Sequence, residues 1–266
     1  MTAINCMNEQ QSWQWQEWQG LPYLTCDLLQ DWKHGFFTQQ CAPRLPEELT
    51  MALASSAKVY RVKQVHGNVV LTPQEIANAP KAETATFPDA DGVITENSAQ
   101  SIWVASADCN PVLIGDRTTG RAAAVHAGWR GTAQQIVPEA IKRFQTEGSK
   151  LVDLVVAIGP AIAGRVYQVS ETVAAEVGKS IVSQTNKAEI LQALFALPDS
   201  PILPDKQSGR VRLDVRKVNQ IQLLHLGFSE SQISVAPYCT YQDQDYFFSY
   251  RRTKLKKVQW SGIVSH

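Results

Sequence analysis

The chain has 266 residues, of which 44% are hydrophobic and 19% are charged, values that are ordinary for a soluble globular protein with a sizeable core. The formal net charge is zero, so the composition does not indicate a nucleic-acid-binding protein. No stretch approaches the ~20 apolar residues of a membrane span, and the first residues lack a signal-peptide pattern, so we expect no membrane association.

The cysteines are an odd number and widely scattered, at Cys6, Cys26, Cys41, Cys109 and Cys239. This spread argues against a disulfide framework and favours a reducing, cytoplasmic location. The basic run over residues 251–257, RRTKLKK, is local, and we interpret it as a solvated edge.

Short strands are the main elements predicted in the first half of the sequence. Trp13 and Trp15 alternate with glutamines, a period that predicts a strand with one buried face. The sequence RTTG predicts a hairpin turn at residues 117–120, leading into a strand that ends near His126. Further strands are expected over residues 58–67, 92–95, 101–107 and 111–116.

Helices alternate less regularly with strands in the second half. A helix is predicted over residues 133–148, with Thr132 as a candidate N-cap and Pro138 in its first turns or at a kink. Asp214 is expected to cap another helix over residues 215–227. The remaining expected elements are a buried strand over 151–160, helices over 167–181 and 188–197, and closing strands over 232–241 and 245–252.

This mixture predicts an α/β (α+β) fold with mixed sheets rather than a regular Rossmann alternation. We find no internal repeat, no low-complexity linker and no point at which the chain divides. The expected organisation is therefore one domain over residues 1–266.

Three side chains suited to zinc lie where predicted strands end. His66 in QVHG and His126 in VHAG are each followed by glycine or alanine-glycine, and Cys109 lies just past a third strand. They are too far apart in the chain for one local zinc knuckle, but neighbouring strands of a sheet can bring them together. Imidazole and thiolate are good zinc ligands, and three protein ligands leave one position for water or substrate, as in catalytic sites.

Other interpretations of these residues remain open. Buried histidines and cysteines are often satisfied core residues. Alternatively, Cys109 is a nucleophile, with His126 as its base and Asp108 nearby. The segment GWRGT favours an anion site at a helix start assisted by Arg130, or a plain strand-to-helix turn with Trp129 packed inward.

Six motifs, in order, resemble one known family. They are KQVHG, DADGVIT, ADCNPVLIGD, AAVHAGWRGT, AIGPAI and YCTYQDQDYFFSYRR, within a motif-bearing core of about residues 59–252. Together they resemble the YfiH/LACC1 family, described as polyphenol oxidase or laccase-like and as purine nucleoside phosphorylase. The ADC and HAGWRG motifs are the most specific part of the match.

The resemblance implies a single-domain, layered α-β-β-α sandwich with a zinc ion held by His66, Cys109 and His126. It implies phosphorolysis of adenosine, inosine, guanosine and methylthioadenosine, with adenosine deamination in the same pocket. Asp108 is our candidate for the carboxylate that moves protons during deamination. The hypothesis also includes Gln64, Arg130 and Tyr238 as substrate-binding residues.

Two alternatives accompany this hypothesis. The older description implies copper-dependent oxidation of phenols, but a multicopper oxidase needs many histidines, and this chain has five, two of them in plausible ligand positions. The non-enzymatic alternative is a zinc-stabilised binding module. Purine nucleoside and phosphate are the partners that the first hypothesis implies, and it leaves the oligomeric state open.

One departure from the family bears on phosphate. The family often reads FxTR near its start, with the arginine available to phosphate, whereas this chain has Gln39 there. A neutral amide holds phosphate less strongly than a guanidinium does. Arg61 and Arg130 are the candidates to compensate. The segment after this motif is shortened, and the tail KLKKVQWSGIVSH also departs from the family pattern.

Overall fold

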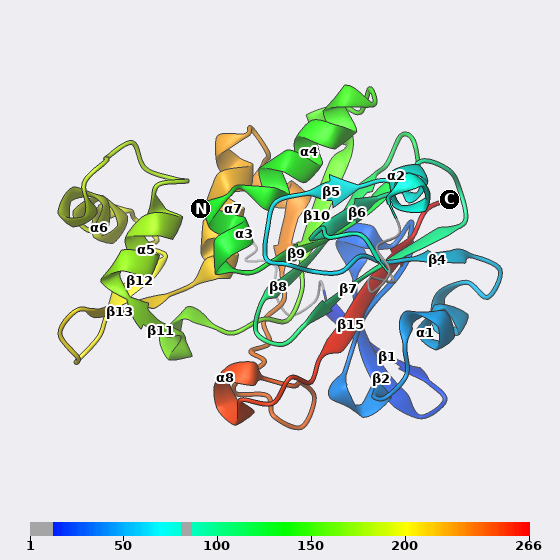
Figure 1. The fold of residues 1–266 in the computed structure, drawn as a ribbon, viewed down its shortest axis with the longest axis horizontal. Coiled ribbons are helices and arrows are strands. Elements are labelled where there is room, and N and C mark those ends of the chain that lie inside the picture. The colour runs from blue at the N-terminus through cyan, green and yellow to red at the C-terminus, as the bar shows by residue number, and fades with distance from the viewer. Residues whose placement is uncertain (1–12, 81–86) are drawn as a thin grey trace, which may run out of the picture.

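Two six-stranded sheets pack face to face in the computed structural model, which describes residues 13–80 and 87–266 (Figure 1). Cys6 lies outside the described residues. Large apolar side chains from both sheets meet between them, among them Phe36, Ile102 and Leu113. This double layer forms the main core and positions the strand ends that carry the site.

The first sheet has the order β1-β2-β3-β15-β7-β4. Its neighbours are antiparallel except for β4, which runs parallel to β7. The strand β15 comes from the very end of the chain and lies between β3 and β7. The bounds are β1 (Trp13–Trp18), β2 (Leu21–Cys26), β3 (Lys33–Phe37), β4 (Lys58–Tyr60), β7 (Gln100–Ser106) and β15 (Gln259–Val264).

The second sheet has the order β14-β10-β8-β9-β6-β5 and mixes both strand directions. The predicted hairpin turn joins β8 to β9, with Gly120 at a φ of 69° where a side chain would be strained. The bounds are β5 (Val70–Leu71), β6 (Gly92–Ile94), β8 (Asn110–Asp116), β9 (Ala122–Ala127), β10 (Leu154–Ile158) and β14 (Ile233–Val235).

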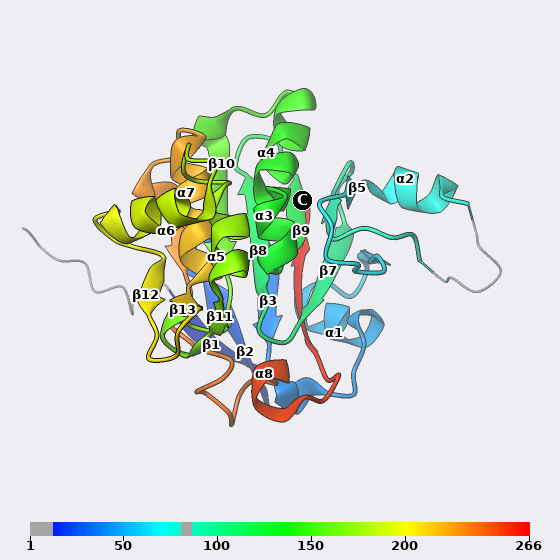
Figure 2. The ribbon, with the colours of Figure 1, turned by 60° about the vertical axis from the view of Figure 1, so that its left-hand side comes forward.

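Helices cover both outer surfaces of the paired sheets. Helix α1 (Pro46–Leu53) packs on the first sheet, and α4 (Ile136–Thr146) and α7 (Val215–His225) pack on the second. Figure 2 shows α4 and the short α3 (Trp129–Ala133) over β8 and β9. The expected α/β fold with mixed sheets in an α-β-β-α arrangement is confirmed.

A third, three-stranded sheet lies beside these layers with its own apolar cluster. It contains β11 (Gln168–Ser170), β12 (Ile202–Pro204) and β13 (Arg210–Leu213), with helices α5 (Glu171–Gly178) and α6 (Lys187–Ala196). The remaining helices are α2 (Pro73–Asn78) and α8 (Tyr250–Thr253). No helix within the described residues combines the length and apolar character needed to cross a membrane.

The structure corrects the predicted start of the long helix. Thr132 is not an N-cap, because it lies inside α3, and α4 begins only at Ile136. Gln135 separates the two helices with a left-handed backbone (φ 60°). Pro138 does lie in the first turn of α4, where a missing backbone N–H costs nothing.

The aromatic segment before the tail is also not the predicted strand. Residues 245–249 form an irregular loop that leads into α8. The Arg252 guanidinium donates to the backbone carbonyls of Thr240 and Phe247, which folds this segment back on itself. Arg251 and Arg252, the first two residues of the basic run, are therefore partly buried, whereas residues 253–257 are exposed to solvent.

The N-terminal strand has less of a buried face than its spacing predicts. Trp13 is buried, but Trp15 is 37% exposed. The Trp15 indole N–H donates to the Tyr238 hydroxyl, and its ring lies beside Tyr246. Its ring also stacks on the buried Phe247, so aromatic partners at the border of the core hold this second tryptophan.

Candidate metal centre

His66, Cys109 and His126 converge at one end of strands β8 and β9 in the second sheet. Their ligand atoms all lie within 4.8 Å of one another. The two imidazole rings meet edge to face, with ring centroids 4.9 Å apart. Within residues 13–80 and 87–266, it is the one group of three or more histidine, cysteine or acidic side chains whose ligand atoms lie close enough together to hold a metal ion.

Each member of this cluster, the His-Cys-His cluster, comes from a different segment. His126 lies in β9, and Cys109 lies in the turn between β7 and β8, next to the strand pair that aligns Pro111 with His126. His66 lies in the loop between β4 and β5 with a left-handed backbone (φ 62°). His126 is buried, Cys109 is half-buried and His66 is exposed, so the cluster opens toward solvent on one side.

Asp91 holds two of the three segments in place. Its fully buried carboxylate accepts a hydrogen bond from His126 Nδ1 at 2.8 Å. It also accepts backbone N–H bonds from Val65, His66 and Gly67 at 3.0, 2.9 and 2.8 Å. Because Nδ1 of His126 is engaged with a carboxylate, Nε2 is the nitrogen left for a metal.

The cluster is electrostatically coupled. Burial acts to raise the pKa of the Cys109 thiol, but the charge of His126 and hydrogen bonds from both imidazoles lower it to about 6. Burial acts to lower the pKa of the His126 imidazole, but Cys109 and Asp91 raise it to about 9. Without metal, the pair is therefore a thiolate beside an imidazolium at neutral pH.

The carboxylate beneath the cluster stays ionised. Burial acts to raise the pKa of Asp91, but hydrogen bonds from His126 and from the backbone of Gly67 and Val65 lower it below its usual value. The negative charge of Asp91 favours a positive charge at His126. In the absence of a metal ion, a proton on the imidazole carries that charge.

The glycines of the GWRG motif leave space for the cluster. A Cβ atom on Gly128 would lie 2.8 Å from Cys109 Sγ and 3.2 Å from His66 Cδ2. A Cβ atom on Gly131 would lie 2.9 Å from the Gly67 carbonyl oxygen. Gly128 has an ordinary φ of −71°, so close approach, rather than unusual backbone geometry, requires glycine there.

This donor set fits a divalent metal. It supplies two imidazoles and a thiol that is already ionised near neutral pH, together with a carboxylate that orients one imidazole from behind. A set of two histidines and one cysteine suits zinc with one open position, and it also occurs in blue-copper sites.

A small cavity of about 30 Å³ adjoins the cluster. Cys109, Trp129 and Tyr167 are among the residues that line it. Burial and the neighbouring Cys109 raise the pKa of Tyr167 to about 12, so its phenol stays protonated and remains a donor. The other lining residues are Asp108, Asn110, Ala127, Gly128, Ile162 and Val215.

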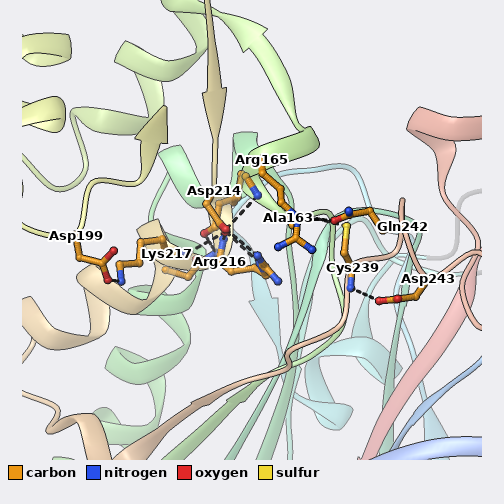
Figure 3. Close-up of polar contacts among 12 residues, drawn as sticks. Ala163, Arg165, Asp199, Asp214, Arg216, Lys217, Cys239, Gln242 and Asp243 are labelled. Carbon is orange, nitrogen blue, oxygen red and sulfur yellow. Dashed lines mark hydrogen bonds and ion pairs between the residues drawn. The ribbon is translucent and has the colours of Figure 1, made fainter. Parts of the chain in front are cut away.

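A polar network lies beside Ile162 and Val215, two of the residues that line this cavity. Asp214 caps α7, accepts from the Gly164 N–H at 3.1 Å and pairs with the Arg216 guanidinium at 2.7 Å (Figure 3). Cys239 accepts from the Ala163 N–H at 3.2 Å. These contacts tie the third sheet and the start of α7 to the central layers.

Asp108, the predicted proton-moving carboxylate, lines the cavity but has both oxygens engaged. They accept hydrogen bonds from the Thr240 hydroxyl and from the Arg251 backbone N–H, each at 2.7 Å. Its backbone is left-handed, with a φ of 90°. Asp108 thus links the turn that carries Cys109 to the segment that leads into α8.

The predicted substrate-binding residues lie in three different settings. The Gln64 amide makes two 2.7 Å hydrogen bonds to the backbone of Ala105. Arg130 is exposed, with its guanidinium 4.3 Å from the centre of the Trp129 ring. Tyr238 contacts Trp15 and Phe247 and does not line the cavity.

Gln39, at the position where the family often has an arginine for phosphate, is bound to the backbone of another segment. The Gln39 amide donates to the Gln244 carbonyl at 2.6 Å. Arg61 pairs with Glu47 at 3.2 Å and stacks on Phe87. Of the two arginines named as candidates to compensate, Arg130 is the one without a carboxylate partner among the ion pairs of the described residues.

Two residues of the site were missed by sequence reasoning. Asp91 lies in the quoted motif DADGVIT, but nothing local distinguishes its role from that of Asp89. Tyr167 was placed inside a predicted helix, although α5 begins only at Glu171.

Comparison with known proteins finds a matching family and related sequences. The family described as multi-copper polyphenol oxidoreductase laccase matches residues 43–263. Purine nucleoside phosphorylase slr1573 of Synechocystis sp. is 54% identical over 257 residues, covering 96% of this chain and 97% of that protein.

Solved structures show the same fold. YlmD from Geobacillus stearothermophilus aligns with a TM-score of 0.77 at 24% identity, over 95% of this chain and 98% of that chain. Bacillus licheniformis hypothetical protein YfiH aligns with a TM-score of 0.72 at 23% identity, over 92% and 96%. The chain therefore belongs to the family described as multi-copper polyphenol oxidoreductase laccase, which confirms the resemblance to YfiH-type proteins inferred from the six motifs.

Proposed function

We propose that this chain is a zinc enzyme that uses phosphate to cleave purine nucleosides into a purine base and ribose 1-phosphate. The observation that carries the proposal is the convergence of His66, Cys109 and His126, of which Cys109 also lines a cavity that Trp129 and Tyr167 share. The name of the relative from Synechocystis sp., purine nucleoside phosphorylase, supports the choice of reaction.

The residues around the cavity suit a nucleoside. Trp129 and Tyr167 offer aromatic faces for a base, and Ile162 and Val215 give apolar contact. Asp91 keeps His126 oriented and holds the loop that carries His66. A zinc ion held by His66, Cys109 and His126 would supply Lewis acidity for the reaction.

The reaction requires a bound phosphate beside the ribose. A phosphate oxygen forms a bond to C1′, the bond from C1′ to N9 breaks, and its electron pair passes to the base. The proton of hydrogen phosphate balances the charge of the departing base. We assign the phosphate contact to Arg130, because Gln39 is neutral and Arg61 is paired with Glu47. Gln64 and Tyr238 remain predicted substrate-binding residues.

The direct test is release of adenine and ribose 1-phosphate from adenosine. Inosine, guanosine and methylthioadenosine complete the panel. We expect base release that depends on phosphate and is lost in Cys109→Ser. Absence of phosphate-dependent release from all four nucleosides in metal-loaded protein would contradict the proposal.

Adenosine deamination in the same pocket is the second activity that we propose. It requires water in place of phosphate and a group that moves protons, for which Asp108 is the candidate from the sequence. Both Asp108 oxygens already accept hydrogen bonds, so Asp108 can move protons only if one of these hydrogen bonds breaks. Formation of inosine from adenosine without phosphate, retained in Arg130→Ala, tests this activity.

Copper-dependent oxidation of phenols is the alternative favoured by the family's description. The His-Cys-His cluster supplies ligands for one copper, not several. The other described histidines lie elsewhere, and the buried His34 has both ring nitrogens engaged by backbone groups of Cys26 and Trp32. Copper-dependent colour from a phenolic substrate, abolished by Cys109→Ala, would favour this alternative.

The non-enzymatic alternative is a zinc-stabilised binding module. It predicts that His126→Ala lowers thermal stability with no turnover to lose.

We retain one domain over residues 1–266 and a cytoplasmic location as parts of the proposal. The thiols of Cys26, Cys41, Cys109 and Cys239 are free, which suits a reducing compartment.

A further inference from the structure

Two arginines from distant segments stack on aromatic residues beside the His-Cys-His cluster. The guanidinium of Arg130, in α3, lies 4.3 Å from the centre of the Trp129 ring, and that of Arg251, in α8, lies 4.6 Å from the centre of the Tyr167 ring. Trp129 and Tyr167 both line the cavity that Cys109 also lines. The fold therefore brings a second arginine, besides Arg130, to the surroundings of this cavity.

Contacts with the protein hold Arg251 in place but leave part of its guanidinium accessible. Its backbone N–H donates to Asp108, and its Nη1 donates to the Gln168 carbonyl, each at 2.7 Å. Within residues 13–80 and 87–266, Nε and Nη2 of Arg251 have no hydrogen-bond partner, and neither is among the buried polar atoms that lack one. The residue is half-buried, so these two nitrogens face solvent, where a ligand can reach them.

Nε and Nη2 form the edge of a guanidinium that binds oxyanions. Arg216 uses this edge to bind the carboxylate of Asp214, at 3.1 Å from Nε and 2.7 Å from Nη2. The edge carries two parallel N–H donors that match two oxygens of a carboxylate or a phosphate. Neither Arg251 nor Arg130 makes an ion pair among the described residues. The same edge of Arg251 therefore suits an oxyanion from outside the chain.

The charges near the cavity favour two cations for one bound phosphate. Asp108 places a carboxylate in the cavity lining, and its negative charge repels a phosphate dianion. Burial raises the pKa of Tyr167 to about 12, and the positive charges of Arg251 and Arg130 both act to lower it. Both charges are thus felt at one residue of the lining, where together they offset the repulsion from Asp108.

We propose that Arg251 binds a phosphate group through Nε and Nη2 and acts together with Arg130. This inference rests on the proposed function, because that reaction needs inorganic phosphate beside the nucleoside. Neither arginine lines the cavity of about 30 Å³, so the phosphate lies outside it, next to Trp129 and Tyr167. Arg251 thereby supplies the positive charge that the neutral Gln39 does not.

Arg251→Met is the main test, because methionine keeps an aliphatic contact with Tyr167 and removes every donor of the guanidinium. We expect the KM for phosphate in inosine cleavage to rise by about tenfold or more, while the KM for inosine stays within about twofold of the wild-type value. Arg251→Lys restores the charge without the two parallel donors, so it should recover part of the loss. An unchanged KM for phosphate in Arg251→Met would overturn the assignment.

Arg165→Met is the matched control. Arg165 is exposed, lies two residues before Tyr167 and donates from Nε to Gln242 at 2.7 Å (Figure 3). It stacks on no aromatic ring of the described residues. The variant removes the same charge from the same part of the chain, and it should leave the KM for phosphate unchanged. Equal rises in Arg165→Met and Arg251→Met would show that general surface charge, rather than the edge of Arg251, attracts phosphate.

Phosphate binding can also be measured without turnover. Calorimetric titration of inorganic phosphate into zinc-loaded protein should show binding about tenfold or more weaker in Arg251→Met than in the wild type. Adenosine 5′-monophosphate, titrated in the same way, distinguishes a phosphate ester from the free ion. A dependence on Arg251 that is confined to the nucleotide would overturn the assignment to the phosphate of the reaction.

A third measurement needs no variant to fold. Phenylglyoxal modifies accessible arginines, and peptide mass spectrometry reports the modification of each one. In wild-type protein, inorganic phosphate should protect Arg251 and Arg130 and leave Arg165 unprotected. Equal modification of Arg251 with and without saturating phosphate would contradict the proposal.

The outcomes separate this inference from the proposed function. If phosphate promotes cleavage of none of the nucleosides, the proposed function fails, and calorimetry and phenylglyoxal labelling still decide whether Arg251 binds phosphate. If cleavage occurs and Arg251→Met keeps the wild-type KM and affinity for phosphate, only the assignment of Arg251 is wrong.

Discussion

Nδ1 of His126 lies 2.8 Å from Oδ1 of Asp91, and the same carboxylate accepts the backbone N–H of His66 at 2.9 Å. One side chain therefore sets the positions of two candidate metal ligands that come from separate segments. It orients the His126 ring directly and holds the loop that carries His66. The geometry of the cluster depends on a residue that is not itself one of the three ligands.

Asp91→Asn is expected to weaken zinc binding by about 10–100-fold, the usual effect of removing a carboxylate behind a histidine ligand. The amide is the same size but loses the negative charge that favours a cation at His126. Competition with a chelating dye of known affinity measures the change.

Asp89→Asn is the matched control for this variant. Asp89 lies two residues earlier and pairs with Lys63 at 3.0 Å, with both side chains 59% exposed. Zinc affinity should stay at the wild-type value, because an exposed ion pair contributes little. Equal weakening by both variants would show that general charge, rather than the contact with His126, controls binding.

Gly128→Ala should lower zinc affinity by roughly tenfold or more, because its Cβ would lie 2.8 Å from Cys109 Sγ and displace that ligand. The φ of −71° suits alanine, so the backbone itself is not strained. Gly67→Ala is the control, since its Cβ would meet ordinary contacts of 3.7 and 3.8 Å. If both variants bind zinc like the wild type, the close packing around Cys109 has been misjudged.

Alkylation of Cys109 in metal-free protein should follow a titration near pH 6. The thiolate is the reactive form, and the lowered pKa means that it already predominates at pH 7. The rate with iodoacetamide should therefore be nearly constant from pH 7 to 9 and decline as the pH falls below 6. Peptide mass spectrometry measures labelling at this residue, with Cys109→Ser as the blank. A midpoint above pH 8 would disagree with a thiolate–imidazolium pair.

The link between Asp108 and Thr240 should be measurable as stability. Both side chains are buried; Asp108→Ala removes the acceptor and Thr240→Val the donor of the 2.7 Å hydrogen bond between them. We expect each to reduce the free energy of unfolding by about 1–3 kcal/mol in urea. In a double-mutant cycle the two losses should be less than additive. Full additivity would show that the two side chains act independently.

The three residues of the His-Cys-His cluster could be singled out as candidate ligands from the sequence, because each interpretation needed only local information. A histidine or cysteine at a strand end, before a glycine or a turn, predicts a side chain at the rim of a sheet. The hairpin between β8 and β9 followed in the same way from RTTG. Hydrophobic spacing also placed Ile136, Ala140 and Phe144 correctly on the buried face of α4.

The parts that were missed depend on pairing between distant segments. Asp91 reaches His126 because β6 lies antiparallel to β9, with Gly92 opposite Val125. The tail forms β15 in the middle of the first sheet, where Ser261 pairs with both Phe36 and Val104. Trp15 finds partners 223 and more residues away. No local period encodes such neighbours.

The central claim is that His66, Cys109 and His126 share a single metal ion. Elemental analysis of purified protein, beside Cys109→Ser and His126→Gln, tests it most directly. We predict one zinc per chain in the wild type and far less than one in either variant. Several copper ions per chain, or a zinc content unchanged by loss of Cys109, would contradict the account.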